Sequence, residues 1–323
     1  MRLSFLVPLA VAFALASPCA PAASAGLSGK PIRIIVGFPA GSTGDLIARI
    51  LSPGLAQRLG QPVIVENRPG AGSTLAADDV ARAQPDGDTL LLSTTANVIN
   101  PDLYPNLRFS FTKDLTPVML IAEAPVVLIG RPNLPYGTVK ELVAAASQAP
   151  GKFNFGSSGN GTITHLYGEL FNQSAKVHLT HVPYKGSSQA LNDVMAGRVD
   201  VAFTPAASVL GQIKAGQVKA LAVVGHRHIA SLPQVPTFAE SGISGLDSTL
   251  WFGLNAPAGT PGATVDRLAA ALAKVLANPE VRQQLADQTI NAVGGTPAQF
   301  AAAIARESAQ WSKVISTAGI KIH

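Results

Sequence analysis

Two short glycine-rich stretches bring hydroxyl, amide and backbone donors to points where a strand pattern changes into a helix pattern. The first is VGFPAGSTGD at residues 36–45, and the second is FGSSGNGTITH at residues 155–165. The first N–H groups of a helix have no acceptor within the helix, and the helix dipole adds about half a positive charge there. Each stretch therefore predicts an anion-binding turn at a helix N-terminus.

The composition of these turns excludes some ligands. The first turn lacks the lysine of a P-loop, and neither Gly41–Gly44 nor Gly70–Gly72 completes the spacing Gly-x-Gly-x-x-Gly, so nucleotide binding is disfavoured. A single turn of this kind is equally well explained as a helix cap. A pair of them, about 120 residues apart, favours a dianion held between two helix ends.

Two alternative chemistries fit parts of the sequence. Ser158 and His165 could be the nucleophile and base of a hydrolase, but their spacing on a helix places them about 10 Å apart, whereas a catalytic pair needs about 3 Å. His226 and His228 would share one face of a strand and could bind a metal, but no third ligand is evident. We therefore expect no metal and no cofactor, and we expect His165 to order the helix start or a ligand's water.

The two turns require a scaffold of alternating strands and helices. Apolar runs at 32–38 and 63–66 predict strands, and an apolar periodicity at 45–59 predicts a helix between them. The same alternation continues along most of the chain, which indicates an α/β protein with parallel or mixed sheets. Two longer apolar stretches, 117–130 and 248–256, are predicted to be paired crossover strands between two lobes.

The chain begins with a segment that resembles a secretory signal peptide. Arg2 is followed by an apolar region from Leu3 to Ala16 and by the small residues Ala23-Ser24-Ala25, so cleavage is expected after Ala25. The remainder is long enough for two lobes of about 150 residues each. We therefore expect residues 1–25 to be removed and the protein to be exported.

The charge and composition of the chain limit the classes of molecule that it is expected to bind. Hydrophobic residues make up 47% of the chain, charged residues 13% and aromatic residues 6%, which is typical of a compact α/β protein. The net charge of +5 is not gathered in runs, whereas nucleic-acid binding would show clustered lysine and arginine. The balance suits small anionic molecules, and no nucleic-acid partner is expected.

Several motifs, taken in order, resemble one family over almost the whole chain after the signal. They are KPIRIIVGFPAGSTGDLIAR, VENRPGAGSTLAADDVARAQPDGDTLL, FGSSGNGTITHLYGELF, HVPYKGSSQALNDVMAGRVDVAF, LPQVPTFAESG and WFGLNAPAGTP. Together they resemble the Bug receptors, the extracytoplasmic substrate-binding proteins of tripartite tricarboxylate transporters. The resemblance implies a periplasmic binding protein of the type II, Venus-flytrap class, with two α/β lobes and two crossover strands.

The resemblance also implies boundaries and a binding mode. Lobe 1 would comprise residues 26–126 and 249–323, and lobe 2 would comprise residues 127–248. A small carboxylate would bind between them, held by main-chain N–H groups and ordered water from the two glycine-rich turns.

Carried onto the matching positions, the resemblance implies ligand contacts from both lobes. Lobe 1 would supply Phe38, Pro39, Ala40, Gly41, Ser42, Thr43 and Asp45, with Thr95 and Asn97 nearby. Lobe 2 would supply Ser157, Ser158, Gly159, Asn160, Gly161, Thr162 and His165, together with Tyr184, Lys185, Gly186 and Thr204.

The sequence departs from the family pattern at three positions. Ser42 and Ser73 stand where the family commonly has glycine, and Asp88 stands where an aromatic residue is usual. The departure at Ser42 falls within the first turn, so it is expected to affect the choice of ligand rather than the fold.

The expected function is that of a monomeric, non-enzymatic periplasmic receptor that delivers a small carboxylate to membrane permease subunits. Two alternatives remain open from the sequence. The same protein could be a ligand sensor for a membrane signalling partner, or a secreted hydrolase of small acids.

Overall fold

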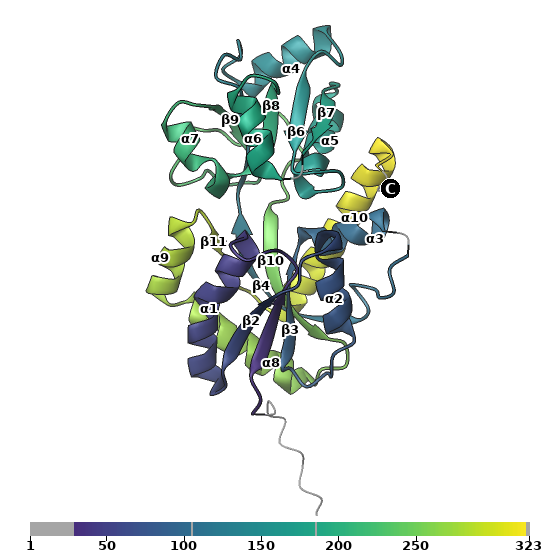
Figure 1. The fold of residues 1–323 in the computed structure, drawn as a ribbon, viewed down its shortest axis with the longest axis vertical. Helices are drawn as coiled ribbons and strands as arrows, with labels where there is room; N and C mark the ends of the chain where they lie inside the picture. The colour runs from purple at the N-terminus through teal and green to yellow at the C-terminus, as the bar shows by residue number, and fades with distance from the viewer. Residues whose placement is uncertain (1–28, 105, 185, 321–323) are drawn as a thin grey trace, which may run out of the picture.

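Two separate sheets, each with helices on both faces, make up the protein. The computed structural model describes residues 29–320 except 105 and 185, so the expected signal peptide (1–25) and Lys185 lie outside the described residues. Figure 1 shows one sheet in each of two lobes, stacked along the long axis and joined by the strands that pass between them. The predicted two-lobed α/β architecture is therefore confirmed.

The first sheet has six strands in the order β11-β4-β10-β3-β1-β2. They are β1 (Ile32–Val36), β2 (Val63–Asn67), β3 (Thr89–Thr94), β4 (Leu115–Ala124), β10 (Leu250–Pro257) and β11 (Asn291–Ala292). Strand β1 pairs in parallel with β2 and β3, whereas β10 runs antiparallel to β3 and β4. This lobe therefore has a mixed sheet with a parallel half that leads into the first glycine-rich turn.

Helices cover both faces of the first sheet. They are α1 (Thr43–Leu59), α2 (Thr74–Ala81), α3 (Thr95–Leu103), α8 (Gly262–Leu276), α9 (Pro279–Asp287) and α10 (Pro297–Ala318), with a short 3-10 turn η1 at Ala71–Ser73. Ile34 of β1 packs in the cluster that contains α1 and α8, while the neighbouring Ile35 packs in the cluster that contains α2 and α3. Successive strand residues point to opposite faces, so a continuous apolar run is buried on both sides.

The second sheet has five strands in the order β7-β6-β8-β5-β9. They are β5 (Val126–Gly130), β6 (Asn154–Ser157), β7 (Thr180–Pro183), β8 (Val201–Pro205) and β9 (Lys219–Val223). Its helices are α4 (Val139–Gln148), α5 (Ile163–Ala175), α6 (Ser187–Met195) and α7 (Leu210–Lys214), with a 3-10 turn η2 at Ala206–Ser208. Val127 and Leu128 of β5 again enter different apolar clusters, which places a helical layer on each face.

The chain crosses between the sheets at two places. The predicted stretch 117–130 divides at Pro125, with β4 in the first sheet and β5 in the second. The return crossing lies between β9 and β10, and β10 pairs with β4 from Leu250↔Ala124 to Pro257↔Leu115. The two predicted crossover segments therefore lie side by side where they meet the first sheet.

Helix α10 connects the two lobes on one side. Its Phe300 packs edge-on against Trp251 of β10, with ring centroids 5.4 Å apart. Near its other end, Trp311 packs edge-on against Tyr167 of α5, with centroids 5.5 Å apart. None of the helices formed by the described residues combines the length and the apolar character that a membrane-spanning segment needs.

Candidate functional site

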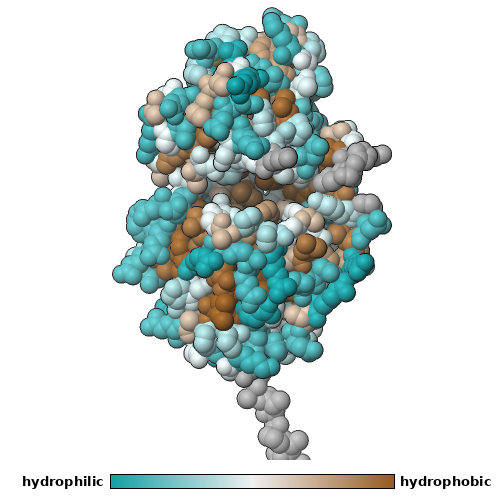
Figure 2. Space-filling view, in the orientation of Figure 1, coloured by the Kyte–Doolittle hydropathy of each residue, from teal (hydrophilic) through white to brown (hydrophobic). Residues whose placement is uncertain are grey.

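A cavity of about 340 Å³ lies between the two lobes and is lined by both glycine-rich turns. Figure 2 shows the molecule hollowed at the waist, with apolar residues inside the hollow. The described residues that line the cavity are Phe38, Ser42, Thr43, Gly44, Gly72, Thr94, Ala96, Asn100, Tyr104, Ser158, Asn160, Gly161, Thr162, Ile163, Thr164, Ser187, Pro205, Leu250 and Phe252. None of these residues has a charged side chain.

The first turn connects β1 to α1 through a tight reversal. The Ser42 N–H donates to the Pro39 carbonyl (3.1 Å), and Gly41 has φ +80°, a left-handed conformation that favours glycine. Ser42 is the N-cap of α1, since its Oγ accepts the Asp45 N–H at 3.4 Å. The helix begins at Thr43, two residues earlier than predicted, so the N–H groups of Thr43 and Gly44 are first-turn donors beside the cavity.

The side chain of Asp45 stabilises this turn from outside the cavity lining. Asp45 is 2% exposed, and its carboxylate accepts the Gly41 N–H (2.9 Å), the Arg49 Nε–H (3.0 Å) and the Asn67 side-chain amide (3.0 Å). Burial opposes ionisation, but the hydrogen bonds from Arg49, Gly41 and Asn67 together outweigh it and lower the pKa of the Asp45 carboxyl. The first turn is therefore fixed by a permanent, paired anion.

The second turn repeats the backbone geometry of the first. The Thr162 N–H donates to the Gly159 carbonyl (3.3 Å), and Gly161 has φ +70°. Thr162 is the N-cap of α5 with φ −75° and ψ 159°, close to the −68° and 160° of Ser42. The Gly161 N–H donates to Nδ1 of His165 at 3.1 Å, in the position where Gly41 donates to Asp45.

A stack of aromatic rings supports the second turn. The rings of His165 and His181 lie 3.7 Å apart and 9° from parallel, and the Phe155 ring stacks beside both, 4.9 Å from His181 and 6.3 Å from His165 between centroids. Nε2 of His181 lies 2.6 Å from Ser157 Oγ. Burial, with the neighbouring His165, lowers the pKa of His181 to about 4, so this ring is neutral at pH 7.

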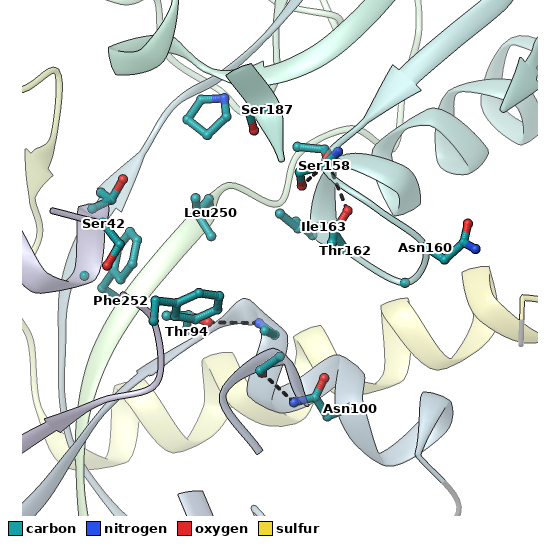
Figure 3. A pocket seen from close by; sticks show the side chains of 18 of the residues that line it. Ser42, Thr94, Asn100, Ser158, Asn160, Thr162, Ile163, Ser187, Leu250 and Phe252 are labelled. Atoms are coloured by element: carbon teal, nitrogen blue, oxygen red, sulfur yellow. Dashed lines mark hydrogen bonds between the residues drawn. The ribbon is translucent and has the colours of Figure 1, made fainter. Parts of the chain in front are cut away.

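The rest of the lining comes from α3, η1 and β10. Thr94 and Asn97 form a capping box at the start of α3, and the Asn100 side-chain amide donates to the Gly72 carbonyl (2.7 Å). Figure 3 shows Leu250 and Phe252 along β10 between the lobes, with Ser158, Thr162 and Ile163 on one side and Thr94 and Asn100 on the other. The cavity therefore has polar turns at its ends and an apolar wall between them.

The structure places the predicted site residues in two groups. Those that line the cavity are Phe38, Ser42, Thr43, Ser158, Asn160, Gly161 and Thr162. Those described but not in the lining are Pro39, Ala40, Gly41, Asp45, Thr95, Asn97, Ser157, Gly159, His165, Tyr184, Gly186 and Thr204. Lys185 lies outside the described residues.

Several residues of the second group lie in the elements that carry the lining. Thr95 Oγ1 accepts the backbone N–H of Trp251 (3.1 Å), which fixes the start of α3 against β10. The Tyr184 hydroxyl donates to Asp193 at 2.7 Å, and Gly186 is the N-cap of α6. Thr204 is buried on β8, one residue before Pro205 of the lining.

Sequence reasoning missed three lining residues of the glycine-rich stretches themselves and the residues that other elements bring to the cavity. These are Gly44, Gly72, Thr94, Ala96, Asn100, Tyr104, Ile163, Thr164, Ser187, Pro205, Leu250 and Phe252. Leu250 and Phe252 could have been predicted from the sequence, because alternate residues of a crossover strand share one face and can together face the space between the lobes. No local sequence pattern indicates that Asn100 and Tyr104 line the cavity, since their position depends on how α3 packs.

The geometry gives no support to the hydrolase pair. Ser158 Oγ is bound to Thr164 Oγ1 (2.8 Å), and Nδ1 of His165 is occupied by the Gly161 N–H. The serine that does contact a histidine is Ser157, which has 0% exposure and therefore cannot reach a substrate. His228 contacts Glu240 and the Pro233 carbonyl, and the described residues contain no cluster of three metal-ligating side chains.

Comparison with known proteins relates this chain to one family of receptors. The family model described as "Tripartite tricarboxylate transporter family receptor" matches residues 47–320. Protein BugT of Bordetella pertussis is 33% identical over 319 residues, which cover 98% of each chain.

Solved structures confirm the predicted periplasmic binding protein fold. Rpa4515 of R. palustris, solved with adipate, is 32% identical with a TM-score of 0.80, over 91% of this chain and 99% of that one. MatC from Rhodopseudomonas palustris, solved with bound malate, is 32% identical with a TM-score of 0.75, over 88% of this chain and 99% of that one.

Proposed function

Because the chain belongs to the receptors of the tripartite tricarboxylate transporter family, which are periplasmic solute-binding proteins, we propose that it captures a small carboxylate between its lobes and delivers it to a tripartite tricarboxylate-type permease. The observation that carries this proposal is the pairing of two helix N-termini on one cavity whose described lining has no charged side chain. An anion there is stabilised by N–H dipoles and hydroxyl groups rather than by an ion pair.

The ligand class follows from the distribution of donors. The N–H groups of Thr43 and Gly44 lie in one lobe, and those of Ile163 and Thr164 lie in the other. A dicarboxylate can engage both sets, with its carbon chain against Leu250 and Phe252. The malate and adipate in the two related structures support this class, since both molecules are dicarboxylates.

We propose that the ligand closes the protein. The proposed lobe 1 comprises residues 26–126 and 249–323 and the proposed lobe 2 comprises residues 127–248, with Val126 as the first residue of β5 at the boundary. A ligand that touches both lobes only in the closed form shifts the population toward that form. The closed monomer, exported after cleavage of residues 1–25, is then the form that the permease subunits recognise.

Calorimetry on residues 26–323 tests the ligand class. We expect malate, adipate or citrate to bind with micromolar affinity, about −8 kcal/mol, and to be recovered unaltered by mass spectrometry. Small-angle X-ray scattering should show a smaller radius of gyration with the bound acid. Chemical turnover of the acid would support the hydrolase alternative and contradict the receptor.

Uptake into proteoliposomes that contain a tripartite permease tests delivery. We expect uptake of the bound acid to require this protein. Tight binding with no effect on uptake would favour the sensor alternative over transport.

A further inference from the structure

The residue before the left-handed glycine distinguishes the two turns. It is Ala40 before Gly41 in the first turn and Asn160 before Gly161 in the second, and Asn160-Gly161 is the one Asn-Gly step in the sequence. An asparagine side chain can react with the backbone nitrogen of the residue that follows it, and glycine leaves that nitrogen unshielded because it has no Cβ. The alanine of the first turn has no group that reacts in this way.

The side chain of Asn160 is free to move. Asn160 is exposed, and among the described residues its side-chain amide has no hydrogen-bond partner. Figure 3 shows it to one side of the cavity, apart from the other labelled side chains. The other asparagine of the lining, Asn100, is instead tied to the Gly72 carbonyl at 2.7 Å. Rotation about its Cα–Cβ bond can therefore bring Cγ of Asn160 to the Gly161 nitrogen.

The backbone nitrogen that would react is held against a base. The Gly161 N–H donates to Nδ1 of His165 at 3.1 Å, so this ring nitrogen carries an available lone pair. The separation lies within the range at which a general base takes a proton from a reacting group. The same ring can return the proton to the group that leaves.

We propose that Asn160 and Gly161 form a succinimide, and that opening of this ring by water leaves a carboxylate at position 160 and disables the second turn. The Gly161 nitrogen forms a bond to Cγ of Asn160, and its proton passes to Nδ1 of His165. The proton then passes to the side-chain nitrogen of Asn160, the Cγ–N bond breaks, and ammonia leaves. Water adds to either carbonyl of the ring, which gives aspartate or isoaspartate.

The product changes the charge and the shape of the cavity. The described lining has no charged side chain, and the new carboxylate lies two residues before Thr162, the N-cap of α5. It therefore occupies the favourable field of this helix N-terminus and repels a second anion. In isoaspartate the backbone is also longer by one carbon, so Gly161 must move. This consequence for binding rests on the proposed function, whereas the reaction itself does not.

Incubation of the ligand-free protein at pH 8, followed by peptide mapping with mass spectrometry, tests the reaction. We expect aspartate and isoaspartate to accumulate at position 160. Asn133 is the internal control, because it is also exposed but precedes Leu134, and it should stay intact. Asn160→Gln needs a larger ring and should also stay intact at this position. An Asn160 that persists as long as Asn133 would overturn the proposal.

Two histidine variants test the proton transfer. His165→Asn keeps an acceptor for the Gly161 N–H but is not a base, so we expect the reaction to slow at least about tenfold. A turn that was merely loosened would react faster instead. The matched control His178→Asn changes an exposed histidine and should react at the wild-type rate. An unchanged or faster reaction in His165→Asn would contradict the role of His165.

Calorimetry with malate and adipate as probes tests the consequence for binding. We expect Asn160→Asp to bind at least about fivefold more weakly than the wild type, as for one added charge near the anion. Incubation should weaken binding by the wild type but not by Asn160→Gln. Full affinity in Asn160→Asp and in the incubated wild type would contradict the effect on the site. If neither acid binds before incubation, the proposed ligand class is wrong, and the mass measurement still decides the reaction.

Discussion

Gly161 and Gly60 have nearly the same left-handed backbone, with φ +70° and +72°, but only Gly161 lines the cavity. A valine at either position strains the backbone by about 1–2 kcal/mol. We predict that Gly161→Val weakens binding of malate or adipate at least about tenfold, because the turn must move away from the cavity. Gly60→Val, at the far end of α1, should lose similar stability in urea unfolding and keep its affinity.

Equal losses of affinity in the two variants would show that backbone strain anywhere in the lobes is sufficient to weaken ligand binding. The second turn would then have no special place in binding.

His181 makes stability depend on pH. The pKa of this ring is lowered by burial from its ordinary 6.5 to about 4, so the unfolded chain binds the proton more readily than the folded protein. The contribution of His181 to the free energy of unfolding is therefore complete above pH 6.5 and decreases as pH falls toward 4. We predict that His181→Gln reduces this decrease in urea unfolding at pH 7.5 and pH 5.

His178→Gln is the matched control for that measurement, because His178 is exposed. The role assigned to His181 fails if both variants keep the wild-type dependence on pH.

At the scale of elements, helix α5 depends on a glycine in its interior. A Cβ added at Gly168 would lie 2.0 Å from the Phe155 ring, which itself stacks on His181. Alanine normally stabilises a helix by about 1 kcal/mol relative to glycine. We predict the opposite for Gly168→Ala, a loss of about 1–3 kcal/mol, because the ring must shift.

Gly211→Ala in α7 is the control, since its Cβ would have no atom within 4 Å. Its free energy of unfolding in urea should stay the same or rise. A stabilised Gly168→Ala would mean that Phe155 has room to move.

The sequence predicted elements better than it predicted the site. The alternation of apolar strands and helices is local, so β1, α1 and the crossovers at β4 and β10 could be predicted from residue patterns alone. The turn chemistry is also local, which is why Ser42 and Thr162 could be named. Asp45 was expected to touch the ligand, but its place behind Gly41 depends on Asn67 from β2, a contact between segments far apart in the chain.

At the scale of the whole molecule, α10 carries one buried aromatic residue for each lobe. Trp311 is 0% exposed and packs on Tyr167 of lobe 2, while Phe300 is 1% exposed and packs on Trp251 of the first sheet. Either change to alanine should destabilise the protein by about 3–5 kcal/mol. We predict that Trp311→Ala separates thermal unfolding into two transitions, because it removes a contact between the lobes.

Phe300→Ala is the matched control and should lower the melting temperature without separating the transitions. Differential scanning calorimetry distinguishes the two results. A single transition in Trp311→Ala would show that the crossover strands alone couple the lobes.

The position of α10 also bears on how a solute enters. Figure 1 shows its C-terminal end beside the upper lobe, where the Gln173 side chain donates to the Val314 carbonyl at 3.4 Å. If one lobe rotates relative to the other while this contact is kept, the axis of rotation lies close to α10. Atoms of the rotating lobe then move further the greater their distance from α10. The cleft between the lobes is therefore expected to open most widely on the side opposite α10. We expect the ligand to enter and leave the cavity on that side.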